Sequence, residues 1–94
     1  MTVLRIQHSV PAYDGWKRAF DTDPVDRRGG GVRRYTVYRS ASDQNFVTID
    51  LEFDDRPSAE RFLVRLRGLW DGPGKAVTFD PKGVVLEEME SVEL

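Results

Sequence analysis

The sequence predicts an α+β domain with the element order βαββαβ, in which a four-stranded antiparallel sheet carries two helices on one face. Three observations lead to this fold class. The chain has 94 residues, which is the length of one domain. Four of its segments have the composition and alternation of strands, and two have the apolar spacing of helices. The order of these segments along the chain selects the class, and we expect residues 1–94 to form a single domain.

The first half of the chain predicts one strand, one helix and one loop. A strand is expected at residues 2–9, because Leu4 and Ile6 alternate there with polar side chains. A helix is expected at residues 11–21, because aromatic side chains recur at spacings of three and four residues. These aromatic residues are Tyr13, Trp16 and Phe20. Residues 22–31 are rich in glycine and aspartate and are therefore expected to form a loop.

The second half predicts a hairpin, a helix and a last strand. Strands at residues 32–40 and 45–54 flank a short polar connection, which is typical of a hairpin. One face of the second of these strands is apolar and comprises Val47, Ile49, Leu51 and Phe53. A helix then ends near Asp71, and its apolar residues follow the helical period: Ala59, Phe62, Leu63, Leu66, Leu69 and Trp70. The last strand is expected from Gly83 to about Val92. We assign both helical stripes to the core, with no ligand role.

Composition argues against several classes of function. The net charge of −2 does not favour a nucleic-acid partner, which normally requires clustered basic residues. No apolar run approaches the roughly 18 residues of a membrane span, so we expect no membrane partner and a cytoplasmic location. The chain has no cysteine and one histidine, and we expect neither a metal nor a bound cofactor. Residues 27–34 (RRGGGVRR) lack the spacing of a phosphate-binding loop, so a flexible, solvated loop is expected there.

The sheet face turned away from the helices is expected to mix charged residues with Val3, Tyr38 and Phe46. A solvated face would have fewer large apolar side chains, and a protein core would have fewer charges. The mixture therefore predicts a homodimer in which two such sheets face each other across a partly wet enclosure.

One stretch of the sequence resembles a known superfamily. It begins with a histidine at the end of the first strand and continues as Tyr-Asp-x-Trp-Lys-x-x-Phe-Asp over residues 13–21. With the βαββαβ order and the short length, this stretch resembles the dimeric α+β barrel superfamily of ferredoxin-like proteins, in particular small bacterial members related to antibiotic-biosynthesis-type monooxygenases. The resemblance implies a homodimer and a small-molecule cavity between each sheet and its helices or loops. The activities that it implies include cofactor-independent oxygenation and polyketide cyclisation, and it does not choose among them.

Five residues are candidates for a functional site. His8 and Asp50 are the catalytic candidates, and His8 ranks first because an unperturbed imidazole titrates near neutral pH. Arg5, Tyr38 and Phe46 are the substrate-binding candidates, with Arg5 as an anion anchor and Tyr38 as an orienting hydroxyl. A structural reading stays open for each of them: His8 could cap a strand end, and Arg5 and Asp50 could pair across a dimer interface.

Two functions of different classes follow from these candidates. The first is a cofactor-independent monooxygenase or cyclase-like enzyme that acts on an aromatic or polyketide-like substrate. The second is a non-catalytic homodimeric module that binds a ligand or a protein partner. A cavity that brings His8 and Asp50 within reach of one enclosed point would favour the enzyme.

Overall fold

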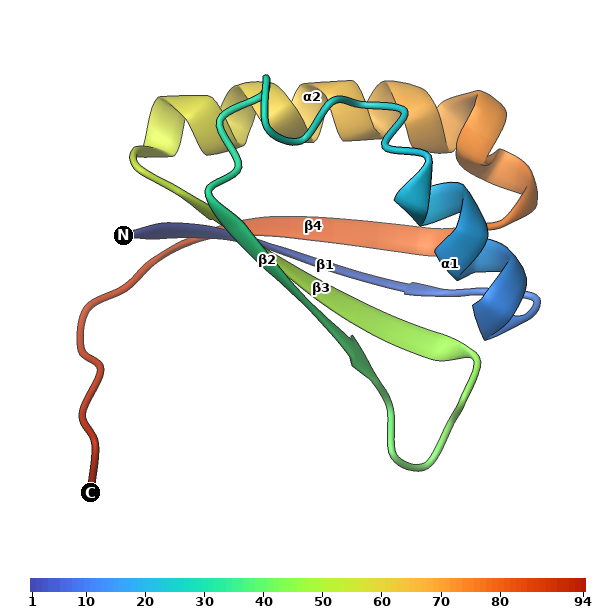
Figure 1. Cartoon of the computed structure of the whole chain (residues 1–94), viewed down its shortest axis with the longest axis horizontal. Helices are drawn as coiled ribbons and strands as arrows, with labels where there is room; N and C mark the ends of the chain where they lie inside the picture. The colour runs from blue at the N-terminus through green and yellow to red at the C-terminus, as the bar shows by residue number, and fades with distance from the viewer.

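The computed structural model describes residues 1–94 and confirms the βαββαβ order and the antiparallel four-stranded sheet (Figure 1). The elements are β1 (Thr2–Ser9), α1 (Tyr13–Asp21), β2 (Arg34–Arg39), β3 (Phe46–Phe53), α2 (Arg56–Asp71), the short 3-10 helix η1 (Pro73–Ala76) and β4 (Phe79–Glu87). The strand order in the sheet is β2-β3-β1-β4, so β1 and β3 are central and β2 and β4 are the edges. Neither helix has the length and apolar composition of a membrane span.

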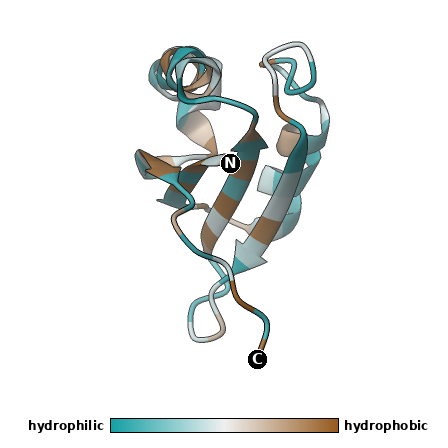
Figure 2. Ribbon diagram, turned by 90° about the vertical axis from the view of Figure 1, so that its left-hand side faces the viewer, coloured by the Kyte–Doolittle hydropathy of each residue, from teal (hydrophilic) through white to brown (hydrophobic).

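The alternation of β1 gives the sheet two different faces. Leu4, Ile6 and His8 are buried on the face that the helices cover, whereas Arg5 and Gln7 lie on the outer face. The register continues this division across the sheet, because Arg5 lies opposite Asp50 of β3 on one side and opposite a valine of β4 on the other. The bands of hydrophobic and hydrophilic residues along the strands in Figure 2 follow the same period of two.

The core lies between the inner face of the sheet and the two helices. The apolar face of β3 is fully buried, as its alternation predicts. From α2 the core receives Ala59, Phe62, Leu63 and Leu66, which confirms the helical stripe. From α1 it receives Trp16, against which Tyr13 and Phe20 are partly buried. The predicted core residues therefore meet in one cluster.

Helix α2 begins with a side-chain cap. The carboxylate of Asp55 accepts a hydrogen bond of 2.8 Å from the backbone N–H of Ser58, and Pro57 follows in the first turn, where its missing N–H costs nothing. This bond lowers the pKa of Asp55, because it stabilises the charged carboxylate. The helix starts three residues before its first buried apolar residue, Ala59.

The predicted bounds of three elements differ from the structure by two residues or more. Strand β2 begins at Arg34 and not at residue 32. Helix α1 starts at Tyr13 and not at residue 11, because the extended Ala12 is the residue before its first turn. Strand β4 spans Phe79–Glu87 and not the stretch from Gly83 to Val92. It ends at Glu87 because Thr2, the first residue of β1, pairs with Glu87 and leaves no further partner strand.

Candidate functional site

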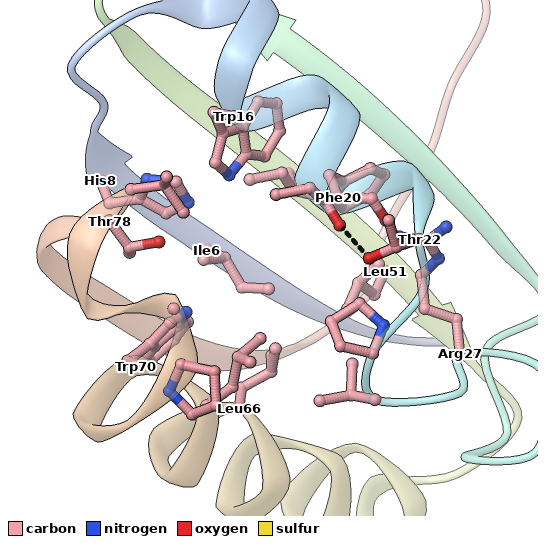
Figure 3. A pocket seen from close by; sticks show the side chains of 18 of the residues that line it. Ile6, His8, Trp16, Phe20, Thr22, Arg27, Leu51, Leu66, Trp70 and Thr78 are labelled. Atoms are coloured by element: carbon pink, nitrogen blue, oxygen red, sulfur yellow. Dashed lines mark hydrogen bonds between the residues drawn. The ribbon is translucent and has the colours of Figure 1, made fainter.

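A cavity of about 220 Å³ lies between the sheet, the two helices and the loop that follows α1 (Figure 3). It is lined by 19 residues, of which 12 are hydrophobic. The remaining lining residues include His8 from β1, Thr78 from the segment before β4, and Thr22 and Arg27 from the loop after α1. A mostly apolar cavity with a few polar groups is the usual form of a small-molecule site.

His8 enters this cavity because of the alternation of β1. The side chain follows Leu4 and Ile6 to the inner face, and only 3% of the residue is exposed. Its ring meets the ring of Trp16 edge to face, with 5.6 Å between the ring centroids. The strand and α1 together therefore fix the imidazole between the sheet and the helix.

The hydrogen bond of the ring determines its tautomer. Nδ1 of His8 lies 3.2 Å from the backbone carbonyl oxygen of Ser9. A carbonyl oxygen can only accept, so in the neutral ring Nδ1 carries the proton and Nε2 has a free lone pair. Nε2 has no hydrogen bond within the protein, and no fully buried side-chain nitrogen or oxygen lacks a partner. Nε2 is therefore reached from the cavity that His8 lines.

Burial also decides the charge of His8. Removal from water lowers the pKa of the ring below its ordinary value of 6.5, and the hydrogen bond to Ser9 opposes this shift only in part. The imidazole is therefore uncharged at pH 7. An uncharged imidazole with a free Nε2 is an acceptor for a ligand hydroxyl and has the protonation state of a general base.

Arg27 lies at the other end of the cavity from His8 (Figure 3). Its guanidinium lies over the rings of Phe20 and Tyr35, at 4.0 Å and 4.8 Å from the two centroids. Nη1 donates a hydrogen bond of 2.9 Å to the carbonyl oxygen of Phe20, and Nε lies 3.3 Å from a carboxylate oxygen of Asp23. Only 14% of the Arg27 side chain is exposed, so the expectation of a solvated loop is wrong at this residue. The reason is the aromatic surface of α1 and β2, which covers the guanidinium.

The structure separates the two catalytic candidates. Asp50 lies on the outer face of the sheet, where it accepts hydrogen bonds of 2.8 Å and 3.0 Å from Arg5. This pairing raises the pKa of Arg5. His8 and Asp50 are thus on opposite faces, and the sheet lies between them. The two side chains do not converge on one point.

The three substrate-binding candidates also lie outside the cavity. Arg5, Tyr38 and Phe46 share the outer face, since Tyr38 pairs with Thr48 and Phe46 with Ser9. Together with Asp50 they form one polar and aromatic surface on the side of the sheet that no helix covers. Their role in binding a substrate stays a prediction for an enclosure between two sheets.

Apart from His8, sequence reasoning missed the polar residues of the cavity and the residues that form its flat walls. The two tryptophans, Trp16 and Trp70, have the spacing of core residues, and that spacing does not distinguish a core position from a cavity wall. Thr78 lies in a segment without periodicity and gave no signal. Arg27 has one local signal, an aspartate four residues earlier, which pairs with it in the structure.

Solved structures match this fold over nearly the whole chain, although no protein-family model and no curated protein matches the sequence. A variant of SnoaB, a cofactor-independent oxygenase from Streptomyces nogalater, matches with a TM-score of 0.72 and 13% identity, covering 97% of this chain and 95% of that one. A Nitrosomonas europaea protein proposed to be an antibiotic biosynthesis monooxygenase matches with a TM-score of 0.68 and 17% identity, covering 94% and 89%. A dimeric ferredoxin-like protein from an uncultured marine organism matches with a TM-score of 0.69 and 13% identity, covering 97% of each chain. At these identities the similarity establishes the fold alone: this chain has a ferredoxin-like βαββαβ fold.

Proposed function

We propose that the protein binds a small, flat and mostly apolar molecule with a hydroxyl group, in the cavity between the sheet and the helices. One observation carries this proposal: an apolar cavity contains an uncharged imidazole whose Nε2 atom has no hydrogen-bond partner. An acceptor in apolar surroundings is stabilised by a ligand that donates a hydrogen bond to it. A phenol or an enol supplies both that donor and the apolar surface.

The volume of the cavity limits the size of this ligand. An apolar cavity of about 150 Å³ accommodates benzene. The cavity here has about 220 Å³ and flat aromatic walls, including Trp16 and Trp70. These dimensions support a ligand of one or two fused rings, stacked against the indoles.

Proton abstraction is the reaction that His8 supports. Nε2 would take the hydroxyl proton of the ligand, and the electron pair would delocalise from the oxygen into the ring. The ring carbon that becomes electron-rich can react with dioxygen, or with a carbonyl of the same molecule. This chemistry supports a cofactor-independent monooxygenase or cyclase-like enzyme on an aromatic or polyketide-like substrate, and SnoaB, which is similar in fold, is a cofactor-independent oxygenase.

A non-catalytic homodimeric ligand-binding or interaction module is the second candidate. The position of Asp50 favours it, because Asp50 pairs with Arg5 on the outer face and leaves His8 as the only acid or base in the cavity lining. In this alternative Nε2 only orients the hydroxyl of the ligand.

Binding of 1-naphthol and naphthalene tests the site. Both tryptophans of the chain line the cavity, so quenching of their emission reports binding there. We expect 1-naphthol to bind about five- to tenfold more tightly than naphthalene, since the two differ by one hydrogen bond to a buried acceptor. His8→Phe should remove this preference and leave naphthalene binding in place. Val64→Phe, on the exposed side of α2, is the matched control and should behave as the wild type. A preference that survives His8→Phe would contradict the proposal.

Oxygen uptake then separates the two candidate functions. One molecule of 1-naphthol and one of dioxygen give 1,4-naphthoquinone and water, so one oxygen atom enters the ring. An oxygenase should raise the rate of this conversion above that in buffer, and His8→Phe should abolish the increase. A protein that binds 1-naphthol without raising the rate of this conversion would be a binding module for such ligands.

A further inference from the structure

We propose that the ligand of this cavity is an acid, and that Arg27 binds its carboxylate while its hydroxyl faces His8. This inference rests on the proposed function, because it concerns the same cavity, and it adds the charge of the ligand. Arg27 is the only side chain with a full charge among the lining residues, since His8 is neutral.

The position of Arg27 gives the cavity two different polar ends. Figure 3 shows His8 and Thr78 at one end and Arg27 and Thr22 at the other, with apolar side chains such as Ile6 between them. The first end offers the acceptor Nε2, and the second offers cationic donors. A ligand that fits both ends has a hydroxyl group and an anionic group on opposite sides of an apolar ring.

The guanidinium is held in place before any ligand arrives. The guanidinium lies over the rings of Phe20 and Tyr35, and the carbonyl oxygen of Phe20 accepts a hydrogen bond from Nη1. Asp23 lies on the Nε side and also accepts a hydrogen bond of 2.9 Å from the backbone N–H of Arg27. A side chain that is already ordered loses little entropy when it binds.

The partners of Arg27 leave part of its donor capacity unused. A guanidinium has five N–H donors. One on Nη1 is bonded to Phe20, and Nε lies 3.3 Å from a carboxylate oxygen of Asp23, whereas Nη2 has no partner within the protein. The free N–H groups suit a carboxylate, which binds a guanidinium through two parallel hydrogen bonds. Arg27 also binds the C-terminal end of α1, so its packing role and the proposed binding role use different N–H groups.

Asp23 is the charged group that opposes this binding. Its carboxylate pairs with Nε and repels a second carboxylate nearby. Asp23 has a backbone φ of 56°, a conformation that asparagine tolerates as well as aspartate does. Asp23→Asn therefore removes the competing charge and preserves both the backbone and the acceptor for Arg27.

Pairs of ligands test the proposal. The probes are 1-naphthol with 5-hydroxy-1-naphthoate, and 2-naphthol with 6-hydroxy-2-naphthoate, in the tryptophan-quenching assay at pH 7.5. In at least one pair we expect the acid to bind about tenfold more tightly than its parent, as for a charge-assisted hydrogen bond. Arg27→Met should remove this advantage and leave naphthol binding within about twofold, since only the carboxylate contact is lost. Arg27→Lys should retain part of the advantage, and Asp23→Asn should increase it.

Arg28→Met is the matched control for net charge. Arg28 is exposed in the same loop and does not line the cavity, so its loss should leave the advantage of the acid unchanged. An equal loss in Arg28→Met would mean that the advantage comes from the overall charge of the loop, which would overturn the role of Arg27. If a naphthol binds and its binding depends on His8, but neither acid binds better than its parent, the inference about the acid is wrong and the proposed function stands. If no naphthol binds, the proposed function fails with it.

Discussion

His8 shows how the position of one residue in a strand determines its chemistry. Leu4 and Ile6 must face the core, and the period of two carries His8 to the same side. A shift of one residue would place the ring on the outer face, in water or between two sheets. Burial instead makes it a neutral acceptor in an apolar cavity, although its sequence neighbours are polar.

The pH dependence of stability follows from this burial. The folded-state pKa of His8 lies below the ordinary value of 6.5, so the unfolded chain binds the proton more readily. The stability that comes from a neutral His8 is therefore complete above about pH 6.5 and is lost as the pH falls toward the lower, folded-state pKa. We expect the free energy of unfolding to decrease between pH 7.5 and 5.5 and to decrease less in His8→Phe. Urea unfolding at both pH values measures the difference, and equal slopes in the two proteins would show that the ring is not buried in the neutral form.

Gly30 is required for the loop after α1 to approach α2. A Cβ at this position would lie 2.4 Å from Cδ1 of Phe62, which is fully buried and cannot move aside. Gly30→Ala should therefore lower the free energy of unfolding by about 1 to 3 kcal/mol, the usual cost of overpacking. Gly15→Ala is the matched control: its Cβ would contact nothing, so it should stabilise α1 by about 1 kcal/mol. Denaturant unfolding of both variants tests this, and a neutral Gly30→Ala would show that the loop is free to move away.

At the scale of elements, α2 contributes to both the core and the cavity. Its buried side chains pack on the sheet, and Leu66, Leu69 and Trp70 also form a wall of the cavity. Strand β4 lies at the edge of the sheet, where a proline is tolerated because one side of the strand has no partner. It contains Pro81, and its pairing with β1 has an irregularity after Gln7. Strand β4 ends where its partner strand β1 begins, so the sequence of β4 alone could not predict this boundary.

The buried stripe of α2 is the main source of helix stability. Leu66→Ala removes a buried side chain and should lower the free energy of unfolding by about 2 to 5 kcal/mol. Val64 is 67% exposed on the same helix, so Val64→Ala should change the free energy of unfolding by no more than about 0.5 kcal/mol. Urea unfolding of both variants measures these changes. A loss below about 0.5 kcal/mol in Leu66→Ala would place this part of α2 away from the core.

At the scale of the molecule, the outer sheet face is left uncovered. It exposes apolar side chains beside charges: Val84 is 50% exposed next to Arg5, and Tyr38 is 53% exposed on β2. We propose that this face is the interface of a homodimer, with the Arg5–Asp50 pair inside it.

The oligomeric state tests this interface. Sedimentation at micromolar concentration should show a dimer for the wild type. Val84→Lys adds a positive charge beside Arg5 on both protomers, so it should shift the equilibrium toward the monomer. Val64→Lys makes the same change on the exposed side of α2 and should leave the dimer intact. A wild type that sediments as a monomer would contradict the homodimer, whereas a Val84→Lys dimer would move the interface elsewhere.

Local periodicity was sufficient to predict the order of the elements and most of the core. Alternation in β3 and the helical spacing in α2 are properties of short segments, and burial of their apolar faces follows directly. The face that carries Arg5, Asp50, Tyr38 and Phe46 was predicted in the same way, because a strand repeats every two residues.

Only the tertiary structure decided where the cavity lies and what it contains. The cavity depends on the distances that separate the sheet from the two helices and from the loop after α1. These distances are set by many side chains that are remote in sequence. The separation of His8 from Asp50 and the covering of Arg27 by Phe20 and Tyr35 are results of this kind. Sequence specifies the face on which a side chain lies through local geometry, whereas the space in front of that face is determined by packing between distant segments.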